Sequence, residues 1–134
     1  MHEQIPEHMS SARPWGRFDQ FATNECVTVK IITVEPGQRL SLQRHQLRRE
    51  LWIVIDGPVD VEVNGESAQL TTGERAWIPV LALHRLGNPG THVARVLEVE
   101  FGFFDEADIE RVEDDYVRPE GLEPPTDLVT KRRA

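Results

Sequence analysis

Short runs of β-branched and aliphatic residues, separated by Gly, Pro and Asn, fill the chain between about Cys26 and Gly102. This spacing is typical of an all-β sandwich or barrel, and helix is scarce. In Val59–Val63 three valines alternate with acidic residues, which predicts a strand with one buried face. Asn64-Gly65, directly after it, predicts a tight hairpin turn. The predicted strands are Cys26–Val34, Leu40–His45, Glu50–Ile55, Val59–Val63, Arg75–Ile78 and Val93–Phe101.

The two ends of the chain differ from this central region. Residues 105–116 are acidic with a few apolar positions, and they predict a short helix or a turn-rich segment that closes the barrel. Residues 119–134 contain Pro119, Pro124 and Pro125 and end in Lys131-Arg132-Arg133, a composition that builds no core. We therefore expect a mobile N-terminus at 1–11, one folded domain at 12–118 and a Pro-rich basic tail at 119–134.

Composition narrows the class of protein. A chain of 134 residues with 39% hydrophobic and 28% charged residues fits one globular domain. The formal net charge of −8 argues against general binding to nucleic acid or anionic membranes. No apolar run is long enough to cross a bilayer, and Met1–Ser11 lacks the features of a secretory signal, so a cytoplasmic location is the default expectation. Cys26 is the only cysteine, so a metal would need His, Gln or carboxylate ligands.

Four side chains could provide such a metal site. Gln43 and His45 are two residues apart and share one face of a strand, and Glu50 can project from the next strand into the same space. With His84 from a second, distant segment they offer one amide oxygen, one carboxylate and two imidazoles, a donor set suited to zinc or another divalent ion.

An alternative follows from the other face of the same strand. Leu40 and Leu42 make that face apolar, and a simple sandwich would turn the leucines inward and leave Gln43 and His45 in water. The metal site requires instead that another strand or another subunit cover the leucines, because an exposed apolar face is a liability. The metal interpretation therefore predicts a homodimer.

The two segments resemble the paired motifs of the cupin superfamily. The first motif is matched by Gly37, Gln43, His45, Glu50 and Gly57, and the second by Gly73, Pro79, His84 and Asn88. The wider sequence is similar to the C-terminal domain of type II phosphomannose isomerases, through Arg13-Pro14-Trp15-Gly16, the stretch from Pro36 to His45, and His84-Arg85-Leu86 followed by Asn88-Pro89-Gly90. The resemblance covers residues 12 to 118 and implies a single-domain cupin, a double-stranded β-helix or jelly-roll barrel.

The resemblance also implies an activity. A divalent metal, zinc first with manganese or cobalt as alternatives, would be held by Gln43, His45, Glu50 and His84. The enzyme would interconvert mannose 6-phosphate and fructose 6-phosphate, a reaction whose enediolate a cation stabilises. Arginine binds phosphate well, and the candidates by resemblance are Arg13, Arg39, Arg48 and Arg118. No catalytic base is identified: Glu98 and Glu100 share a face of a late strand, and either reach the cavity or face solvent.

The chain departs from the family pattern at Gln46, Leu47, Leu51 and Phe103. Histidine or another polar residue is usual at these places, so the departures bear on the substrate pocket. Two further interpretations stay open for this reason: a non-catalytic sugar-binding cupin, and a metal cupin that acts on another small substrate.

Overall fold

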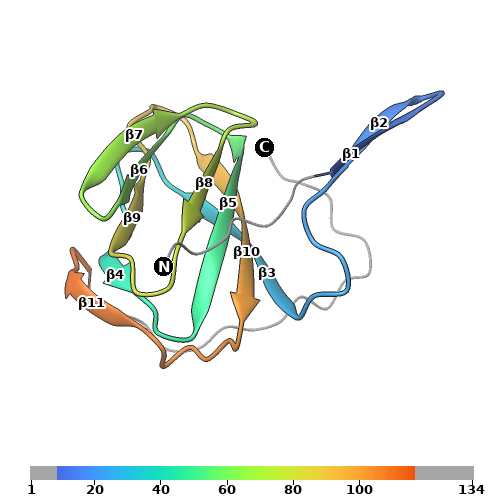
Figure 1. Cartoon of the computed structure of the whole chain (residues 1–134). Coiled ribbons are helices and arrows are strands. Elements are labelled where there is room, and N and C mark those ends of the chain that lie inside the picture. The colour runs from blue at the N-terminus through green and yellow to red at the C-terminus, as the bar shows by residue number, and fades with distance from the viewer. Residues whose placement is uncertain (1–8, 117–134) are drawn as a thin grey trace, which may run out of the picture.

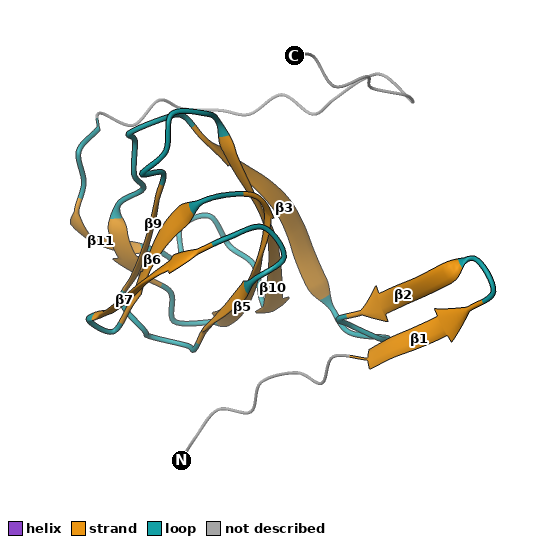
Figure 2. Ribbon diagram, turned by 90° about the horizontal axis from the view of Figure 1, so that it is seen from above, coloured by secondary structure: helices purple, strands orange, loops and turns teal. Residues whose placement is uncertain are grey.

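The computed structural model describes residues 9–116 of the chain. In this part the chain forms eleven strands and no helix (Figures 1 and 2). The strands are β1 (Met9–Arg13), β2 (Gly16–Gln20), β3 (Val27–Val34), β4 (Leu42–Arg44), β5 (Arg48–Asp56), β6 (Val59–Val63), β7 (Glu66–Leu70), β8 (Arg75–Ile78), β9 (His84–Gly87), β10 (Ala94–Gly102) and β11 (Glu110–Glu113). None of the described residues belongs to a helix long and apolar enough to span a membrane.

Two sheets face each other and enclose the core. One has the strand order β3-β10-β5-β8 and the other β11-β4-β9-β6-β7. The main hydrophobic cluster lies between them, with Val54 and Val96 from the first sheet against Val61 and Leu86 from the second. This arrangement confirms the all-β barrel that the sequence predicts.

The sequence predicted the limits of two strands accurately. Strands β6 and β8 have the predicted limits, and Asn64 and Gly65 both have positive φ in the hairpin that joins β6 to β7. A glycine at the second position avoids the steric cost of that conformation. The short strands β7, β9 and β11 and the hairpin strands β1 and β2 were not predicted.

The helix considered for residues 105–116 is absent. This segment turns at residues 106–107 and then forms β11, whose side chains are all exposed. β11 pairs with β4, where Glu110 lies opposite Arg44, at what would otherwise be a free sheet edge. The strand is set by this long-range pairing, which the local sequence does not encode.

The hairpin of β1 and β2 stands apart from the barrel in both views (Figures 1 and 2). It forms its own two-stranded sheet, and it begins at Met9, inside the stretch 1–11 that was expected to be mobile. The predicted tail at 119–134 lies outside the described residues.

The inner face of the sheet β3-β10-β5-β8 changes character along the strands. Near one end the inward side chains are apolar, among them Val54 and Val96, which lie opposite each other. Toward the other end they are charged: Glu50 lies opposite Glu100, and the next inward position of β10 is Glu98. The barrel thus has a dry end that holds the core and a polar end that holds the candidate site.

Candidate metal centre

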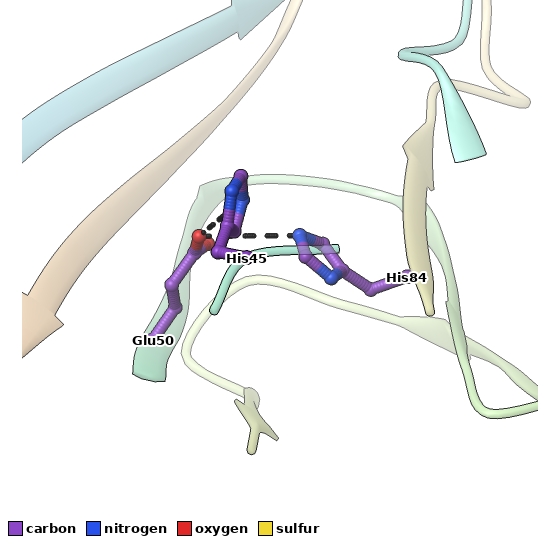
Figure 3. Close-up of side chains that lie close together, drawn as sticks. All are labelled: His45, Glu50 and His84. Atoms are coloured by element: carbon purple, nitrogen blue, oxygen red, sulfur yellow. Dashed lines mark ion pairs between the residues drawn. The ribbon is translucent and has the colours of Figure 1, made fainter. Parts of the chain in front are cut away.

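Three side chains from separate parts of the chain converge at the polar end of the barrel (Figure 3). Glu50 projects from β5, His84 from the start of β9, and His45 from the turn after β4. Glu50 Oε1 lies 3.0 Å from His45 Nε2 and 3.9 Å from His84 Nε2, and all three residues are buried. Their ligand-type atoms lie within 4.8 Å of one another. The structure therefore brings together three of the four predicted ligands.

The backbone sets the orientation of both imidazole rings. His45 Nδ1 lies 2.7 Å from the carbonyl oxygen of Asp108, and His84 Nδ1 lies 2.9 Å from that of Ala82. A carbonyl only accepts, so each Nδ1 carries a proton and donates it. In the neutral ring the lone pair is then on Nε2, which faces Glu50. Backbone carbonyls commonly orient metal-binding histidines in this way.

Lone-pair atoms of the two histidines and Glu50 face one another at this centre. Among the described residues, His84 Nε2 is buried without a hydrogen-bond partner, while His45 Nε2 lies 3.0 Å from a Glu50 oxygen that only accepts and 3.2 Å from Nη2 of Arg48, which donates to it. A proton or a metal cation between the histidines and Glu50 relieves the contact of these acceptors. Two ligands at about 2.1 Å from a zinc ion are roughly 3 to 3.5 Å apart, close to the separations found here. The donor set and its spacing therefore fit a divalent cation.

The turn that carries His45 is fixed from two sides. The carboxylate of Asp108 accepts hydrogen bonds from the backbone N–H groups of Gln46 and Leu47. Gly102, at the end of β10, has φ +110°, and a Cβ there would lie 2.6 Å from the carbonyl oxygen of Leu47. Only glycine allows this close approach. Asp108 and Gly102 are positioning residues that the sequence analysis did not single out.

Gln43 is placed beside the three converging residues. It lies directly opposite His84 in the β4–β9 pair, so the two side chains share the inner face. Its Oε1 accepts a hydrogen bond from Ser41, whose side chain is fully buried. A carbonyl oxygen accepts more than one contact, so Gln43 remains the predicted fourth ligand.

A second group of carboxylates adjoins the site. Glu98 and Glu100 are buried on the inner face of β10, which settles the open choice between cavity and solvent. Trp52 Nε1 lies 2.9 Å from both Glu50 Oε2 and Glu98 Oε2 and donates to this pair. Burial, together with contacts to Glu100 and Glu50, raises the pKa of Glu98 to about 11. Glu98 is therefore neutral near pH 7 and can donate a proton to a neighbouring carboxylate.

The other pKa shifts follow from burial and from neighbouring charge. Burial lowers the pKa of His84, against the charge of Glu50, and keeps the ring neutral. Burial alone would raise the pKa of Glu50, but its contacts with His45 and with Glu98 outweigh burial and lower it. A neutral imidazole beside an ionised carboxylate is the protonation state that a metal site requires.

Two cations border the site. Arg48 is buried, with its Nε 3.4 Å from Glu50 Oε1 and 3.5 Å from Glu100 Oε2. Lys30 Nζ lies 3.4 Å from Glu100 Oε1, and the ring of Phe104 lies against both Lys30 and Arg48. Neither carboxylate oxygen of Glu100 has a hydrogen-bond partner within the described part of the chain.

The other arginines predicted to bind phosphate are not found beside the three ligands. Arg13 is on β1 in the separate hairpin, where its guanidinium lies over the ring of Phe18. Arg39 forms an ion pair with Asp115 and lines a cavity of about 620 Å³ on another part of the surface. Arg118 lies outside the described residues. Of the four predicted arginines, the structure brings Arg48 to the three converging ligands.

The four residues that depart from the family pattern lie outside the three converging ligands. Leu51 is buried on the outer face of β5 with Val99 and Phe101, so it does not line the site. Gln46, Leu47 and Phe103 are exposed. Two tryptophans near the site pack within hydrophobic clusters, Trp52 in the core between the sheets and Trp77 on the outer face.

Comparison with known proteins identifies the family. Residues 1–114 match the family described as "Mannose-6-phosphate isomerase C-terminal". The chain belongs to this family. It is 41% identical over 116 residues to the alginate biosynthesis protein AlgA of Pseudomonas aeruginosa, with 86% of this chain covered. It is 42% identical over 112 residues to the mannose-1-phosphate guanylyltransferase ManC of Salmonella typhimurium, with 83% covered. The chain spans about a quarter of these relatives, 24% and 23% of their lengths.

Solved structures confirm the fold of this family member as a cupin. A protein with a double-stranded β-helix domain from Klebsiella pneumoniae aligns with a TM-score of 0.58 and 21% identity, over 84% of this chain and 90% of that one. A cupin 2 conserved barrel protein from Salinispora arenicola aligns with a TM-score of 0.53 and 19% identity, over 75% and 76%. The expected double-stranded β-helix is therefore correct.

Removing His84 tests the site directly. We expect His84→Ala to lower the affinity for zinc by more than about 100-fold, because loss of a ligand exceeds the 10- to 100-fold cost of losing a partner behind a ligand. The barrel should still fold, since His84 lies at the polar end and is not part of the main hydrophobic cluster. Metal content after dialysis and far-UV circular dichroism measure the two effects. His92→Ala, at an exposed position, is the matched control, and retention of metal by His84→Ala would contradict the assignment.

The raised pKa of Glu98 predicts a pH effect in metal-free protein. Between the ordinary value of 4.5 and about 11 the folded state binds one more proton than the unfolded chain, so the free energy of unfolding falls as pH rises. Glu98→Gln keeps a neutral hydrogen-bonding group and should flatten this slope. Urea titrations with a chelator, from neutral to mildly alkaline pH, measure it. The exposed Glu66→Gln should leave the slope unchanged, and an equal slope in Glu98→Gln and wild type would refute the assignment.

Proposed function

We propose that this chain is a metal-dependent aldose–ketose isomerase that interconverts mannose 6-phosphate and fructose 6-phosphate. The observation that carries the proposal is the convergence of His45, Glu50 and His84 at the polar end of the barrel, with both Nε2 lone pairs turned toward the carboxylate. Membership in the family of mannose-6-phosphate isomerase C-terminal domains supports this choice of reaction.

The reaction suits these ligands. Hydrogen transfer between C1 and C2 of the sugar passes through an enediolate, and a bound zinc, manganese or cobalt ion supplies a positive charge that stabilises it by several kcal/mol. Two imidazoles, one carboxylate and the predicted Gln43 oxygen would hold that ion. The isomerisation involves no net oxidation or reduction, so a metal without redox chemistry is sufficient.

Arg48 is the phosphate-binding residue of this proposal. It is the predicted arginine that borders the ligands, and a guanidinium makes charge-assisted, bidentate contacts with phosphate. Its position beside the three converging ligands would orient the sugar end of the substrate toward the site. The ring of Phe104 against the guanidinium limits the directions from which an anion can approach.

Glu100 and Lys30 are the groups we assign to proton transfer. Glu100 lies directly opposite the ligand Glu50 in the β5–β10 pair, and its oxygens make no hydrogen bond in the described residues. Lys30 contacts it from β3 and is partly exposed, so the pair connects the buried site with solvent. A positioned acid–base group contributes roughly 10²- to 10⁴-fold to such a reaction.

The proposal covers the isomerase step alone. The relatives carry names such as mannose-1-phosphate guanylyltransferase, but this chain spans only about a quarter of their length. A homodimer and a cytoplasmic location remain predictions that accompany the proposed function.

An activity assay tests the proposal. Protein loaded separately with zinc, manganese and cobalt is incubated with mannose 6-phosphate, and the fructose 6-phosphate formed is measured. We expect turnover with at least one metal, loss of turnover in Glu50→Gln because a ligand is lost, and wild-type turnover in His92→Ala. Glu100→Gln should lower kcat by about 100-fold or more while the metal is retained.

Other outcomes separate the alternatives. Ligand-dependent thermal shifts without turnover would support a non-catalytic sugar-binding protein, because a ligand of the native state raises Tm by mass action. Consumption of oxygen by the ferrous protein would favour a metal cupin acting on another substrate. Absence of turnover with all three metals would contradict the isomerase proposal.

Substitution of Arg48 tests phosphate binding. Arg48→Gln should lower kcat/KM for mannose 6-phosphate by roughly 10- to 100-fold, the value of one charge-assisted contact of about 1.5 to 3 kcal/mol. Metal content is measured alongside, since Arg48 also contacts Glu50. Arg39→Gln is the matched control, because Arg39 is paired with Asp115 outside the site. Equal losses in the two variants would rule out the assignment.

A further inference from the structure

An apolar strip is exposed on the outer face of β3. The outward side chains Val27, Val29 and Ile31 are exposed, Val29 by 56% and Ile31 by 60%. The strip continues onto β10, where the partly buried Leu97 lies opposite Ile31. Contiguous exposed apolar surface of this kind marks an interaction site more often than a free surface.

The hairpin of β1 and β2, which we term the arm, exposes apolar side chains as well. Trp15 at its tip is 73% exposed, and Met9 and Phe18 are also exposed. The two strands pair with each other and with no other described strand. An isolated two-stranded hairpin is marginally stable in water unless it packs against another surface.

The position where the arm leaves the barrel is fixed. Phe21, directly after β2, packs on the outer face with Leu51 and Val99, and the guanidinium of Arg75 lies over its ring. Beyond this anchor the arm extends away from the barrel, past the edge strand β3, in both views (Figures 1 and 2). The arm therefore does not cover the strip of its own chain.

We propose that the occupant of the strip is a second copy of this chain, whose arm packs on the outer face of β3 while its own strip receives the first copy's arm. One chain carries both surfaces, so a two-fold axis satisfies both at once and closes the assembly at a dimer. The separate hairpin and the uncovered strip are then two halves of one interface.

The distribution of charge favours a second copy over a charged partner. The chain has a net charge of −8, and two copies repel each other wherever carboxylates meet. The outward positions of β3 carry no charged residue. The face of the arm that holds Met9 and Phe18 also contains Ser11, Arg13 and Gln20 and presents no carboxylate. Copies can approach through these two surfaces without like-charge repulsion between acidic groups.

This surface differs from the one considered from the sequence alone. Leu40, part of the leucine face that was expected to need cover, packs against the core of its own barrel. The homodimer therefore does not depend on that face. It does not depend on the isomerase proposal either, because the strip and the metal centre lie on opposite faces of the same sheet.

Measurement of mass in solution tests the proposal. Over a dilution series, light scattering of the wild-type chain should give twice the 15.3 kDa of one copy. Val29→Glu places a charge in each of two equivalent contacts and should weaken association by about 100-fold or more. Val112→Glu, on β11 at a position with 57% exposure, is the matched control and should remain dimeric. Circular dichroism and metal content should equal those of the wild type in both variants.

A second variant identifies the arm. The double substitution Trp15→Ser with Phe18→Ser should give monomers, and mixing it with Val29→Glu should restore a weak heterodimer through the one remaining arm–strip contact. A wild-type monomer would overturn the proposal, and so would a dimer that Val29→Glu leaves intact. A dimer broken by Val29→Glu but not by the arm substitutions would show a strip-to-strip contact and would overturn the arm exchange.

Discussion

The charge balance inside the barrel is the constraint on which the candidate site depends. Glu50, Glu98 and Glu100 are buried together, and three ionised carboxylates without compensation would be very costly in such a place. The compensation comes from the indole N–H of Trp52, from the two cations Arg48 and Lys30, and from a proton retained on Glu98. Because these groups and His45, which contacts Glu50, satisfy the carboxylates, His84 Nε2 is left without a hydrogen-bond partner among the described residues.

The same sheet supplies stability and chemistry from different ends. Inward positions of β5 and β10 are Val54 and Val96 near one end and Glu50 and Glu100 near the other, in one continuous register. The apolar end fixes the strands, and the register then fixes which polar side chains meet. A shift by one residue in either strand would turn Glu50 or Glu100 to the outer face. The rigidity that a metal centre requires thus comes from packing that contains no ligand.

The sequence predicted the ligands better than the groups around them. The family resemblance and the strand periodicity together predicted four ligands, Gln43, His45, Glu50 and His84. Three of them, His45, Glu50 and His84, converge as expected. The sequence did not exclude Arg39 as a phosphate-binding residue, because its ion-pair partner Asp115 is 76 residues distant along the chain. The orientation of Glu98 and Glu100 was open, since β10 carries apolar residues on both of its faces and alternation alone does not say which face is inside. β11 was missed because pairing with β4 defines it.

Successive residues of β5 point alternately to the candidate metal centre and to the outer apolar cluster. Arg48, Glu50 and Trp52 point inward to the candidate metal centre, whereas Leu51 points outward, opposite Val99, in the apolar outer cluster that adjoins the exposed strip of β3. A residue that departs from the family pattern at an outward position changes the packing of this outer cluster rather than the donor set. The departure at Leu51, which is buried, is therefore a change in the apolar cluster next to the proposed dimer contact. It gives no reason to doubt the chemistry that the inward residues support.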